Sequence, residues 1–281
     1  MKKVNCLNTR IQKSIILIAL LFSGIFPIHA QCFKGNTAVG PAEYLAYDVS
    51  YQVGPVWTNI AQATFTTAKE MNNGKNVLHF KLSAKTYPTY DHLFKVRDYY
   101  ESWVSPESFQ PVRFQRYTVH KTNTILSSQL FNAASSSVYS TYRLNNDPVS
   151  SVNFTVGACV FDMVSVMYFA RNLNLDYLRD GTLVPVSALY GNVVYQVSFI
   201  AAGREIITAR DGKKYHCMKF RIKMPPGLKI FKENSEVNLW VTADKNRIPV
   251  YMEAEIFLGK VKINLNEAKG MLNPMTALLS Q

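Results

Sequence analysis

The chain has 281 residues, and its 31 Lys and Arg against 19 Asp and Glu give a formal net charge of +12. The basic residues are scattered singly along the sequence, which argues against nucleic acid as a partner. Tyr and Phe, with 16 residues each, outnumber the 13 Gly and the 12 Pro, and this balance favours pleated sheet over a helical bundle.

Residues 1–30 have the pattern of a signal peptide. An apolar run covers 14–26, a small residue ends the segment, and the run is preceded by Lys2, Lys3, Arg10 and Lys13. A retained membrane helix is the alternative, but the run is shorter than the ~20 residues that span a bilayer. A lipid anchor on Cys32 is a second alternative, although Gln31 before it departs from the Gly, Ala or Ser of a lipoprotein signal.

Removal of this segment leaves a mature chain, 31–281, with a smaller charge. Four of the 31 basic residues and none of the 19 acidic ones are lost, so the net charge becomes +8. We predict a single antiparallel β domain whose ordered core covers about 44–265. Its basic surface suits anionic lipid or acidic polysaccharide, although charges scattered over strand faces are the plainer interpretation.

Three cysteines stay in the mature chain, namely Cys32, Cys159 and Cys217, because Cys6 lies in the signal segment. In an oxidising compartment they imply one disulfide and one free thiol, and the sequence allows three pairings. We favour Cys159 with Cys217, since both lie inside structured segments and Cys32 lies near a terminus. Three buried free thiols are the alternative.

Alternating apolar and polar residues predict strands in the first half of the domain, over 44–53, 60–69, 77–84, 95–104, 112–121, 129–131 and 138–143. Turn residues separate them. Asn72, Asn73 and Gly74 form a hairpin signal, and Ser105 with Pro106 marks a second turn. Short connections between consecutive strands indicate a meander.

Residues 161–171 break the alternation and predict a short helix. The segment has no turn residue, and one helical stripe comprises Phe161, Val164, Tyr168 and Arg171. A helix that is apolar on nearly all sides must be buried, so we expect it to pack against the sheet. A lipid pocket lined by Met163 and Met167 is the alternative.

Strands resume after the helix, over 182–187, 193–202, 205–209, 215–224, 236–242 and 250–265. In the last segment the apolar side chains change parity at Gly259, which predicts either a bulge in one bent strand or a hairpin. One helix within a long antiparallel meander predicts a mostly all-β fold. We expect a large curved sheet, as a sandwich or half-barrel, with the short helix packed against it.

Four blocks of the sequence occur in a familiar order: KVRDYYESWVSPESFQPVRFQR, FDMVSVMYFARNL, GREIITARDGKKYHCMKF and VNLWVTADKNRIPVYMEAEIFLGKVKINL. The residues that match the motifs are Lys95, Arg97, Asp98, Tyr100, Glu101, Pro111, Arg113, Phe114, Asp162, Ser165, Tyr168, Arg171, Trp240, Asp244, Arg247, Pro249 and Glu253. Together they resemble an exported bacterial family, domain of unknown function 3108, from about Tyr47 to Leu265.

This resemblance implies a periplasmic or outer-membrane-associated β protein with a large antiparallel sheet. It implies no activity, so no catalytic residue carries over to this chain. The segment from Val156 to Cys159 stands where the family has a proline before the helix, and this departure leaves the start of the helix open.

Carboxylates in the late strands are candidates for acid catalysis. Glu253 and Glu255 lie two residues apart on one strand face. Glu101 or Asp98 from another strand would complete a glycosidase-like pair if the carboxyl groups lay roughly 5 to 10 Å apart across a cleft. We expect instead that these carboxylates form cross-strand ion pairs with lysines and with Arg97, Arg113 and Arg116.

Other catalytic and metal-binding patterns are missing from the sequence. It contains no G-x-S-x-G elbow, no Gly-rich phosphate loop and no C-x-x-C pair. His216 and Cys217 are neighbours in a predicted strand and point to opposite faces, so they do not form a dyad. The remaining histidines of the mature chain are far apart, at His79, His92 and His120. We therefore predict no catalytic residue, no metal and no cofactor.

Aromatic side chains recur on the mixed strand faces, at Tyr87, Tyr90, Tyr99, Tyr100, Trp103, Tyr117, Tyr139, Tyr142, Tyr190 and Tyr195. Such rings suit sugars or lipid headgroups, although Tyr is common in strands in any case. We expect a non-enzymatic protein of the periplasm or outer membrane, not membrane-spanning after cleavage, that binds a lipid or polysaccharide. A partner in capsule or outer-membrane assembly and a carboxylate-dependent envelope hydrolase are the alternatives.

Overall fold

A computed structural model of the chain describes residues 35–53, 55–93, 95–175, 178–226, 235–256 and 259–280. All of these residues lie in one compact unit, Cys32–Gln281. The signal peptide predicted at 1–30 lies outside the described residues, and so do Cys6 and Cys32. Within the described part of the chain, no helix has both the length and the apolar character needed to cross a membrane.

The described residues form one sheet of 15 strands. Its N-terminal arm comprises β1 (Tyr44–Val53), β2 (Val56–Asn72), β3 (Lys75–Thr86), β4 (Val96–Val104), β5 (Pro111–His120), β6 (Asn123–Asn132), β7 (Ser137–Leu144) and β8 (Ser150–Thr155). Its C-terminal arm comprises β9 (Val160–Asp162), β10 (Leu183–Tyr190), β11 (Val193–Thr208), β12 (Lys214–Lys223), β13 (Glu236–Thr242), β14 (Pro249–Ile256) and β15 (Gly259–Lys269). The described helices are η1 (Pro88–Tyr90) and α2 (Ser165–Arg171).

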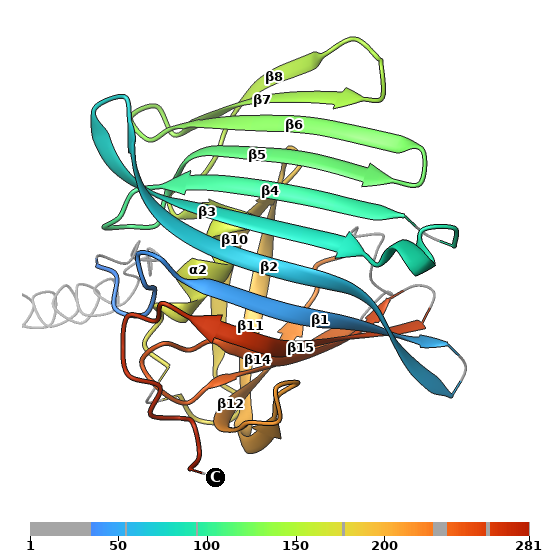
Figure 1. Ribbon diagram of the computed structural model, residues 1–281. Helices are drawn as coiled ribbons and strands as arrows, with labels where there is room; N and C mark the ends of the chain where they lie inside the picture. The colour runs from blue at the N-terminus through green and yellow to red at the C-terminus, as the bar shows by residue number, and fades with distance from the viewer. Residues whose placement is uncertain are drawn as a thin grey trace, which may run out of the picture. The chain divides into compact units, whose positions relative to one another are not determined.

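The two arms meet in the middle of the sheet, because β1 pairs with β15. The strand order is β8-β7-β6-β5-β4-β3-β2-β1-β15-β14-β13-β12-β11-β10-β9, so the two edge strands, β8 and β9, are consecutive in the chain. Neighbouring strands are antiparallel throughout, except that β9 is parallel to β10. Figure 1 shows both arms as meanders.

The sheet curves until its two arms touch. Gln129 Nε2 in β6 donates a hydrogen bond of 2.6 Å to the carbonyl of Gly191, in the turn after β10. Ser102 Oγ in β4 donates a bond of 2.5 Å to Asp162 Oδ2 in β9. In Figure 1 the C-terminal arm accordingly passes behind the N-terminal arm. The predicted curved antiparallel sheet with one packed helix is confirmed.

The helix α2 packs between the arms through aromatic side chains. The ring of Tyr168 stacks on Phe80 of β3 with their centroids 3.8 Å apart, and Phe169 stacks on Phe161 of β9 at 4.0 Å. All four side chains are buried, and burial of apolar surface contributes ~25 cal/mol per Å². Met167, by contrast, is 40% exposed, so helix-to-sheet packing describes this segment better than a methionine-lined lipid pocket.

The helix begins four residues later than the predicted range 161–171. Residues 160–162 form β9 instead, and Asp162 ends that strand. Its Oδ1 accepts hydrogen bonds from the backbone N–H groups of Val164 and Ser165 at 2.8 and 2.9 Å. This is an Asx turn, a local alternative to helical hydrogen bonding, and it delays the first helical turn.

Three strand predictions differ from the structure. The alternation does not predict β8, because five of its six residues are exposed and no apolar face marks it. The predicted strands 193–202 and 205–209 are one strand, β11, with a bulge between Ala201 and Arg204. The parity change at Gly259 is a hairpin, since Ile256 pairs with Gly259 across β14 and β15.

The predicted disulfide between Cys159 and Cys217 is wrong. Cys159 is disulfide-bonded, whereas Cys217 is a free and buried thiol. Cys217 lies in β12 within a core of side chains from both ends of the chain. The position of Cys217 inside a strand therefore reflects its place in the core, and it does not indicate a disulfide with Cys159.

Candidate functional site

The strands β4 to β7 carry two faces of different chemistry. Ser102 bonds to β9, and Phe114 belongs to the core around α2, so these side chains point inward. Alternate residues of a strand point to opposite faces. Tyr99, Glu101 and Trp103 therefore lie on the face directed away from α2, which we call the outer face.

The strand register aligns the outer side chains in three rows across β4, β5, β6 and β7. The tyrosine row comprises Tyr99, Tyr117, Leu126 and Arg143. The polar row comprises Glu101, Gln115, Ser128 and Thr141. The tryptophan row comprises Trp103, Arg113, Leu130 and Tyr139.

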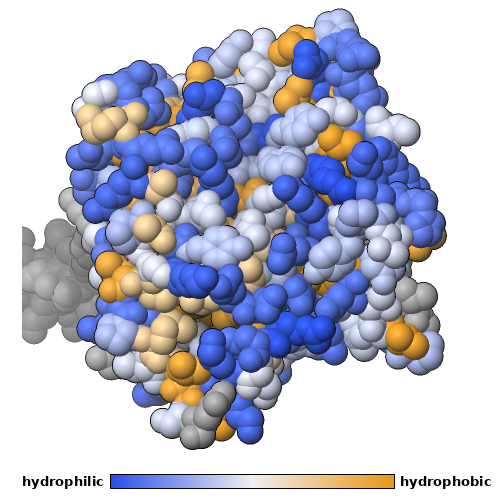
Figure 2. All heavy atoms as spheres, in the orientation of Figure 1, coloured by the Kyte–Doolittle hydropathy of each residue, from blue (hydrophilic) through white to orange (hydrophobic). Residues whose placement is uncertain are grey.

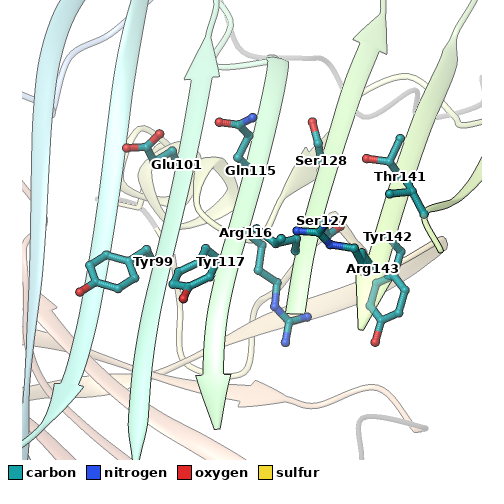
Figure 3. Close-up of a pocket in the computed structure, with 12 residues that line it drawn as sticks. Tyr99, Glu101, Gln115, Arg116, Tyr117, Ser127, Ser128, Thr141, Tyr142 and Arg143 are labelled. Carbon is teal, nitrogen blue, oxygen red and sulfur yellow. The ribbon is translucent and has the colours of Figure 1, made fainter. Parts of the chain in front are cut away.

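The tyrosine row and the polar row line a hollow of about 480 Å³, with Val149 beside them. Figure 3 shows Glu101, Gln115, Ser128 and Thr141 next to one another on four neighbouring strands. Ser128 and Thr141 are short, so the hollow is deepest over β6 and β7, and the polar row forms its floor. We call this hollow the outer trough. Figure 2 shows this side of the molecule as mostly hydrophilic, with separate apolar groups.

Two tyrosines present their rings at the trough. Tyr99 and Tyr117 are 37% and 42% exposed, and their ring centroids are 6.0 Å apart with an interplanar angle of 33°. Exposed aromatic faces combine an apolar surface with a hydroxyl group, a chemistry that suits the mixed surface of a sugar. Lys85 Nζ lies 5.1 Å from the centroid of Tyr99 and covers one side of that ring.

A second aromatic group borders the tryptophan row. The ring of His79 stacks on Trp103 with centroids 4.1 Å apart, and Arg113 Cζ lies 5.0 Å from the Trp103 centroid. Glu70 Oε1 lies 2.8 Å from His79 Nδ1, and Trp103 Nε1 donates to Glu70 Oε2 at 3.2 Å. The hydrogen bond from His79 is the main cause that lowers the pKa of Glu70, so this carboxylate is ionised near neutral pH.

The late carboxylates form structural ion pairs. Glu253 pairs with Lys262 and Glu255 with Lys260, each at 3.2 Å, as expected for cross-strand partners. They line a smaller hollow of about 340 Å³ on β14 and β15. Four strands separate β14 from Glu101 in β4, which at the usual ~4.8 Å strand spacing is roughly 24 Å along the sheet. The structure therefore does not bring Glu101 together with Glu253 or Glu255.

Asp98 lies on the inner face and pairs with a histidine that the sequence patterns did not connect to it. His120 Nε2 lies 2.7 Å from Asp98 Oδ1, and Tyr100 OH donates to Asp98 Oδ2 at 3.3 Å. Burial raises the pKa of Asp98, while His120 and Tyr100 act in the opposite direction. The Asp98 side chain is only 14% exposed, and it faces neither Glu101 nor the outer trough.

The arginines expected to pair with carboxylates divide into two kinds. Arg97 follows the expectation, since its Nη2 lies 2.5 Å from Asp91 Oδ2. Arg113 and Arg116 do not, because their guanidinium groups pack on aromatic rings. Arg116 Cζ lies 5.9 Å from the centroids of both Tyr100 and Tyr190.

The adjacent His216 and Cys217 point to opposite faces, as predicted. Cys217 is 1% exposed, while His216 is exposed to solvent. Burial raises the pKa of the Cys217 thiol to about 12, so it remains protonated near neutral pH. Within the described residues, no cluster of three His, Cys, Asp or Glu side chains is arranged to hold a metal ion.

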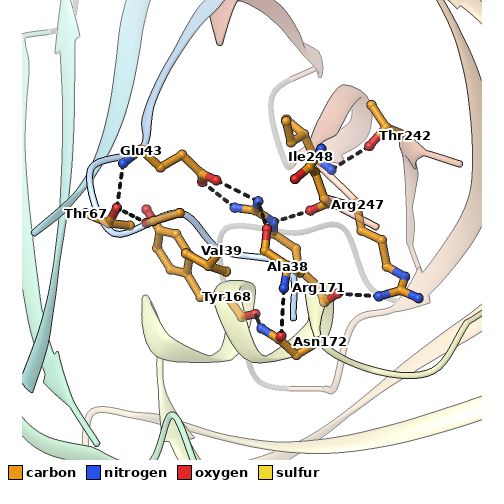
Figure 4. A network of polar contacts seen from close by, with 12 residues as sticks. Ala38, Val39, Glu43, Thr67, Tyr168, Arg171, Asn172, Thr242, Arg247 and Ile248 are labelled. Atoms are coloured by element: carbon orange, nitrogen blue, oxygen red, sulfur yellow. Dashed lines mark hydrogen bonds and ion pairs between the residues drawn. The ribbon is translucent and has the colours of Figure 1, made fainter. Parts of the chain in front are cut away.

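A buried polar network surrounds Arg171 at the end of α2, and we call it the arginine network (Figure 4). The guanidinium group donates to Glu43 Oε1 and Oε2 at 2.5 and 2.9 Å. It also donates to the backbone carbonyls of Asn246 and Ala38 at 2.9 and 3.1 Å. The side chains of Arg171 and Glu43 are 5% and 1% exposed.

The arginine network continues into the turn between β13 and β14. Asp244 Oδ1 accepts bonds from Thr242 Oγ1 and from the N–H of Asn246 at 2.8 and 3.0 Å. Asn246 Nδ2 donates to the carbonyl of Asn273 at 2.9 Å, near the C-terminus. Arg247 Nη1 donates to the carbonyl of Arg171 at 3.1 Å. These motif residues thus tie together the N-terminal segment, α2 and the C-terminal tail, which is a structural role.

The fold and the trough define a class: a barrel-like protein of one open, strongly curved antiparallel sheet, plugged by a helix and grooved on its outer face. The chain belongs to the family described as "Protein of unknown function (DUF3108)", whose family model matches residues 46–266. The resemblance found in the sequence blocks is therefore confirmed.

One solved structure shows a similar fold at low sequence identity. The chain is similar to the crystal structure of a beta-barrel-like protein of domain of unknown function DUF1849 from Brucella abortus. That match has a TM-score of 0.51 and 7% identity, and it covers 83% of this chain and 99% of the other. A "putative lipoprotein" from Parabacteroides distasonis ATCC 8503 matches with a TM-score of 0.33 and 11% identity over 85% of this chain and 100% of the other. No curated protein matches the chain.

Proposed function

We propose that this protein is an exported, non-enzymatic component of the cell envelope that binds a polysaccharide in the outer trough. The observation that carries the proposal is the pairing of a tyrosine row with a polar row on one exposed face. A sugar ring has an apolar C–H face and a rim of hydroxyl groups, so it needs an aromatic surface and hydrogen-bonding groups side by side. The signal-like segment 1–30 supports export.

A polysaccharide suits this site better than a lipid. The floor of the trough consists of Glu101, Gln115, Ser128 and Thr141, whose polar groups would be left without water or partners beneath an acyl chain. The space between the two arms is packed with aromatic side chains around α2.

Binding without catalysis is supported by the state of the carboxylates near the trough. Glu101 is the one acidic side chain among those that line it, and it lies 3.9 Å from Lys81 Nζ and 3.8 Å from His79 Nε2. A glycosidase needs two carboxyl groups that flank the scissile bond. The lining residues supply a single one, already engaged by basic neighbours.

The test is affinity electrophoresis and calorimetry of the mature protein with a panel of envelope and capsule polysaccharides. We expect Tyr117→Ala to weaken binding at least tenfold, because stacking on an aromatic side chain contributes ~0.5–1.5 kcal/mol beyond the area it buries, and the polar row loses its flank. Tyr195→Ala is the matched control, since Tyr195 is partly exposed and lies on β11 in the other arm.

Two results would overturn this proposal. Equal affinity of Tyr117→Ala and wild type for every polymer would remove the site from the trough. Absence of binding to any polysaccharide, with a defined lipid or a protein co-purifying from the envelope fraction in native mass spectrometry, would favour the lipid carrier or the assembly partner.

A further inference from the structure

Three basic side chains border the outer trough without an acidic partner. They are Lys85, Arg113 and Arg143, and within the described residues none of them forms an ion pair with a carboxylate. Lys85 and Arg113 lie over the rings of Tyr99 and Trp103 at 5.1 and 5.0 Å. Aromatic faces position a cation but do not neutralise its charge, so these groups remain available to an anion.

Of these three basic residues, Arg143 is the one that lines the hollow itself. It belongs to the tyrosine row, it is exposed, and Figure 3 shows it beside Ser127 with its guanidinium group among the lining side chains. Arg113 lies in the tryptophan row, on the other side of the polar row, and its Nε atom is buried without a hydrogen-bond partner. A guanidinium group with free donors in a fork is suited to the two oxygens of a carboxylate, sulfate or phosphate.

Around the outer trough the basic side chains outnumber the carboxylates. On β14 and β15 each exposed carboxylate has its lysine, as in Glu253 with Lys262 and Glu255 with Lys260. Around the trough Glu101 faces Lys81 and His79, whereas Lys85, Arg113 and Arg143 have no carboxylate partner among the described residues. A binding face that neutralises its acids and leaves its bases unpaired favours an anionic ligand.

We infer that the ligand of the outer trough is an acidic polysaccharide, one that carries carboxylate, sulfate or phosphate groups along its chain. This inference rests on the proposed function and specifies its ligand class. Tyr99 and Tyr117 would contact sugar faces, while Arg143 and Lys85 would pair with the anionic groups at the rim. Four strands at ~4.8 Å spacing give a run of roughly 14 Å, which is long enough for several such contacts in register.

The experiment uses matched polymers that differ only in charge: polygalacturonate against its fully methyl-esterified form, and dextran sulfate against dextran. Calorimetry with the mature protein is expected to give at least tenfold tighter binding to an acidic polymer than to its neutral counterpart. The preference should shrink as salt rises from 50 to 200 mM, because exposed charges are screened within ~10 Å at 0.1 M.

Two double variants separate a specific site from general attraction to a polyanion. Lys85→Gln with Arg143→Gln is expected to weaken binding of the acidic polymer at least tenfold. Arg204→Gln with Lys214→Gln removes the same charge from exposed positions on the C-terminal arm, and its affinity should stay within twofold of wild type.

The outcomes distinguish this inference from the proposed function. Equal affinity for acidic and neutral polymers, with dependence on Tyr117, would overturn the acidic ligand and leave polysaccharide binding intact. Equal losses of affinity in the two double variants would also overturn the acidic ligand, since the polymer would then be attracted by the overall charge of the protein and not by the trough. Failure of all four polymers to bind would overturn the acidic ligand in its own right, and failure of the wider panel would overturn polysaccharide binding as well.

Discussion

Arginine side chains occur in both the arginine network and the outer trough, but their interactions differ. In the network, Arg171 directs its donors to two carboxylate oxygens and two carbonyls, all of them inside the protein. In the trough, Arg113 and Arg143 lie near aromatic rings and short polar side chains, with no carboxylate partner among the described residues. Arg171 therefore has all its partners within the protein, whereas the guanidinium groups of Arg113 and Arg143 have no acidic partner in the described part of the chain.

This difference, rather than residue type, is the basis on which we assign a structural role to the first site and propose a binding role for the second. A buried cation must have its partners within the protein, because its desolvation is not otherwise compensated. An exposed cation has no such requirement, so a cluster of unpaired ones on one face costs little in stability and is free to serve a ligand. Mutations should therefore affect stability at the first site and binding at the second.

Arg171→Met should have the largest effect on stability. The substitution leaves Glu43 buried with an uncompensated charge, which typically costs about 3–5 kcal/mol. Urea unfolding followed by circular dichroism would measure the loss. The double variant Glu43→Gln with Arg171→Met also removes the unpaired carboxylate, so it should recover part of the lost stability. A single variant within 1 kcal/mol of wild type would contradict the role of the pair.

The disulfide of Cys159 should rank second. Cys217 is free, and Cys6 falls in the segment expected to be cleaved, so Cys32 is the partner that we predict in the mature chain. Loss of a disulfide that closes so long a loop typically costs about 2–4 kcal/mol. Cys32→Ser should lower the urea midpoint accordingly, and non-reducing peptide mass spectrometry should find the linked pair. Alkylation of Cys32 in the native, unreduced protein would contradict this pairing.

Asp162→Asn should have a smaller effect that depends on pH. Burial raises the pKa of Asp162, although bonds from Ser102 and from the Ser165 and Val164 backbone oppose the shift. The folded-state pKa therefore lies above the unfolded value of about 3.9. The stability that the carboxyl group contributes is full below the unfolded pKa, and it is lost as pH rises through the folded pKa.

The measurement for Asp162 is the free energy of unfolding of wild type minus that of Asp162→Asn, from pH 3 to pH 8. Because asparagine does not titrate, this difference should fall as pH rises. A difference that grew with pH would mean that the fold stabilises the ionised carboxylate, contrary to the dominance of burial.

Arg143→Gln should have the smallest effect on stability, within about 0.5 kcal/mol of wild type, as is usual for exposed positions. Urea unfolding would show this, and the same preparation would serve the binding experiment. A loss above 1 kcal/mol would place Arg143 with the arginine network, as a structural residue, and would erase the contrast between the two regions.

The sequence predicts local features of this fold well. Alternation and turn residues such as Asn73 and Gly74 locate the hairpin of β2 and β3, and Pro249 begins β14 as expected for a residue without a backbone donor. The helix α2 is predicted because residues 161–171 contain no turn residue and carry an apolar stripe. Each of these signals lies within a few consecutive residues, where the physical cause is local.

Features that depend on the pairing of strands distant in the sequence cannot be predicted from local patterns. The outer trough arises from register, since Glu101, Gln115, Ser128 and Thr141 come from four strands and none is unusual in its own segment. The partner of Cys159 is likewise not indicated by any pattern near Cys159. The sequence also gives no role to a motif residue such as Arg171, because its partner Glu43 lies 128 residues away along the chain.

The meeting of β1 and β15 in the middle of the sheet has a consequence for how the chain folds. Most strand pairs are sequential hairpins, whereas β1 must find a strand more than two hundred residues away, as in the pairing of Tyr44 with Lys269. Such a non-local contact costs loop-closure entropy before it is formed and slows folding. The edges β8 and β9 are consecutive, and Gly40 lies against the backbone of Gly270. A circular permutant opened at Gly157, with the old ends joined, would turn every antiparallel pair into a local hairpin and should fold faster than the natural chain.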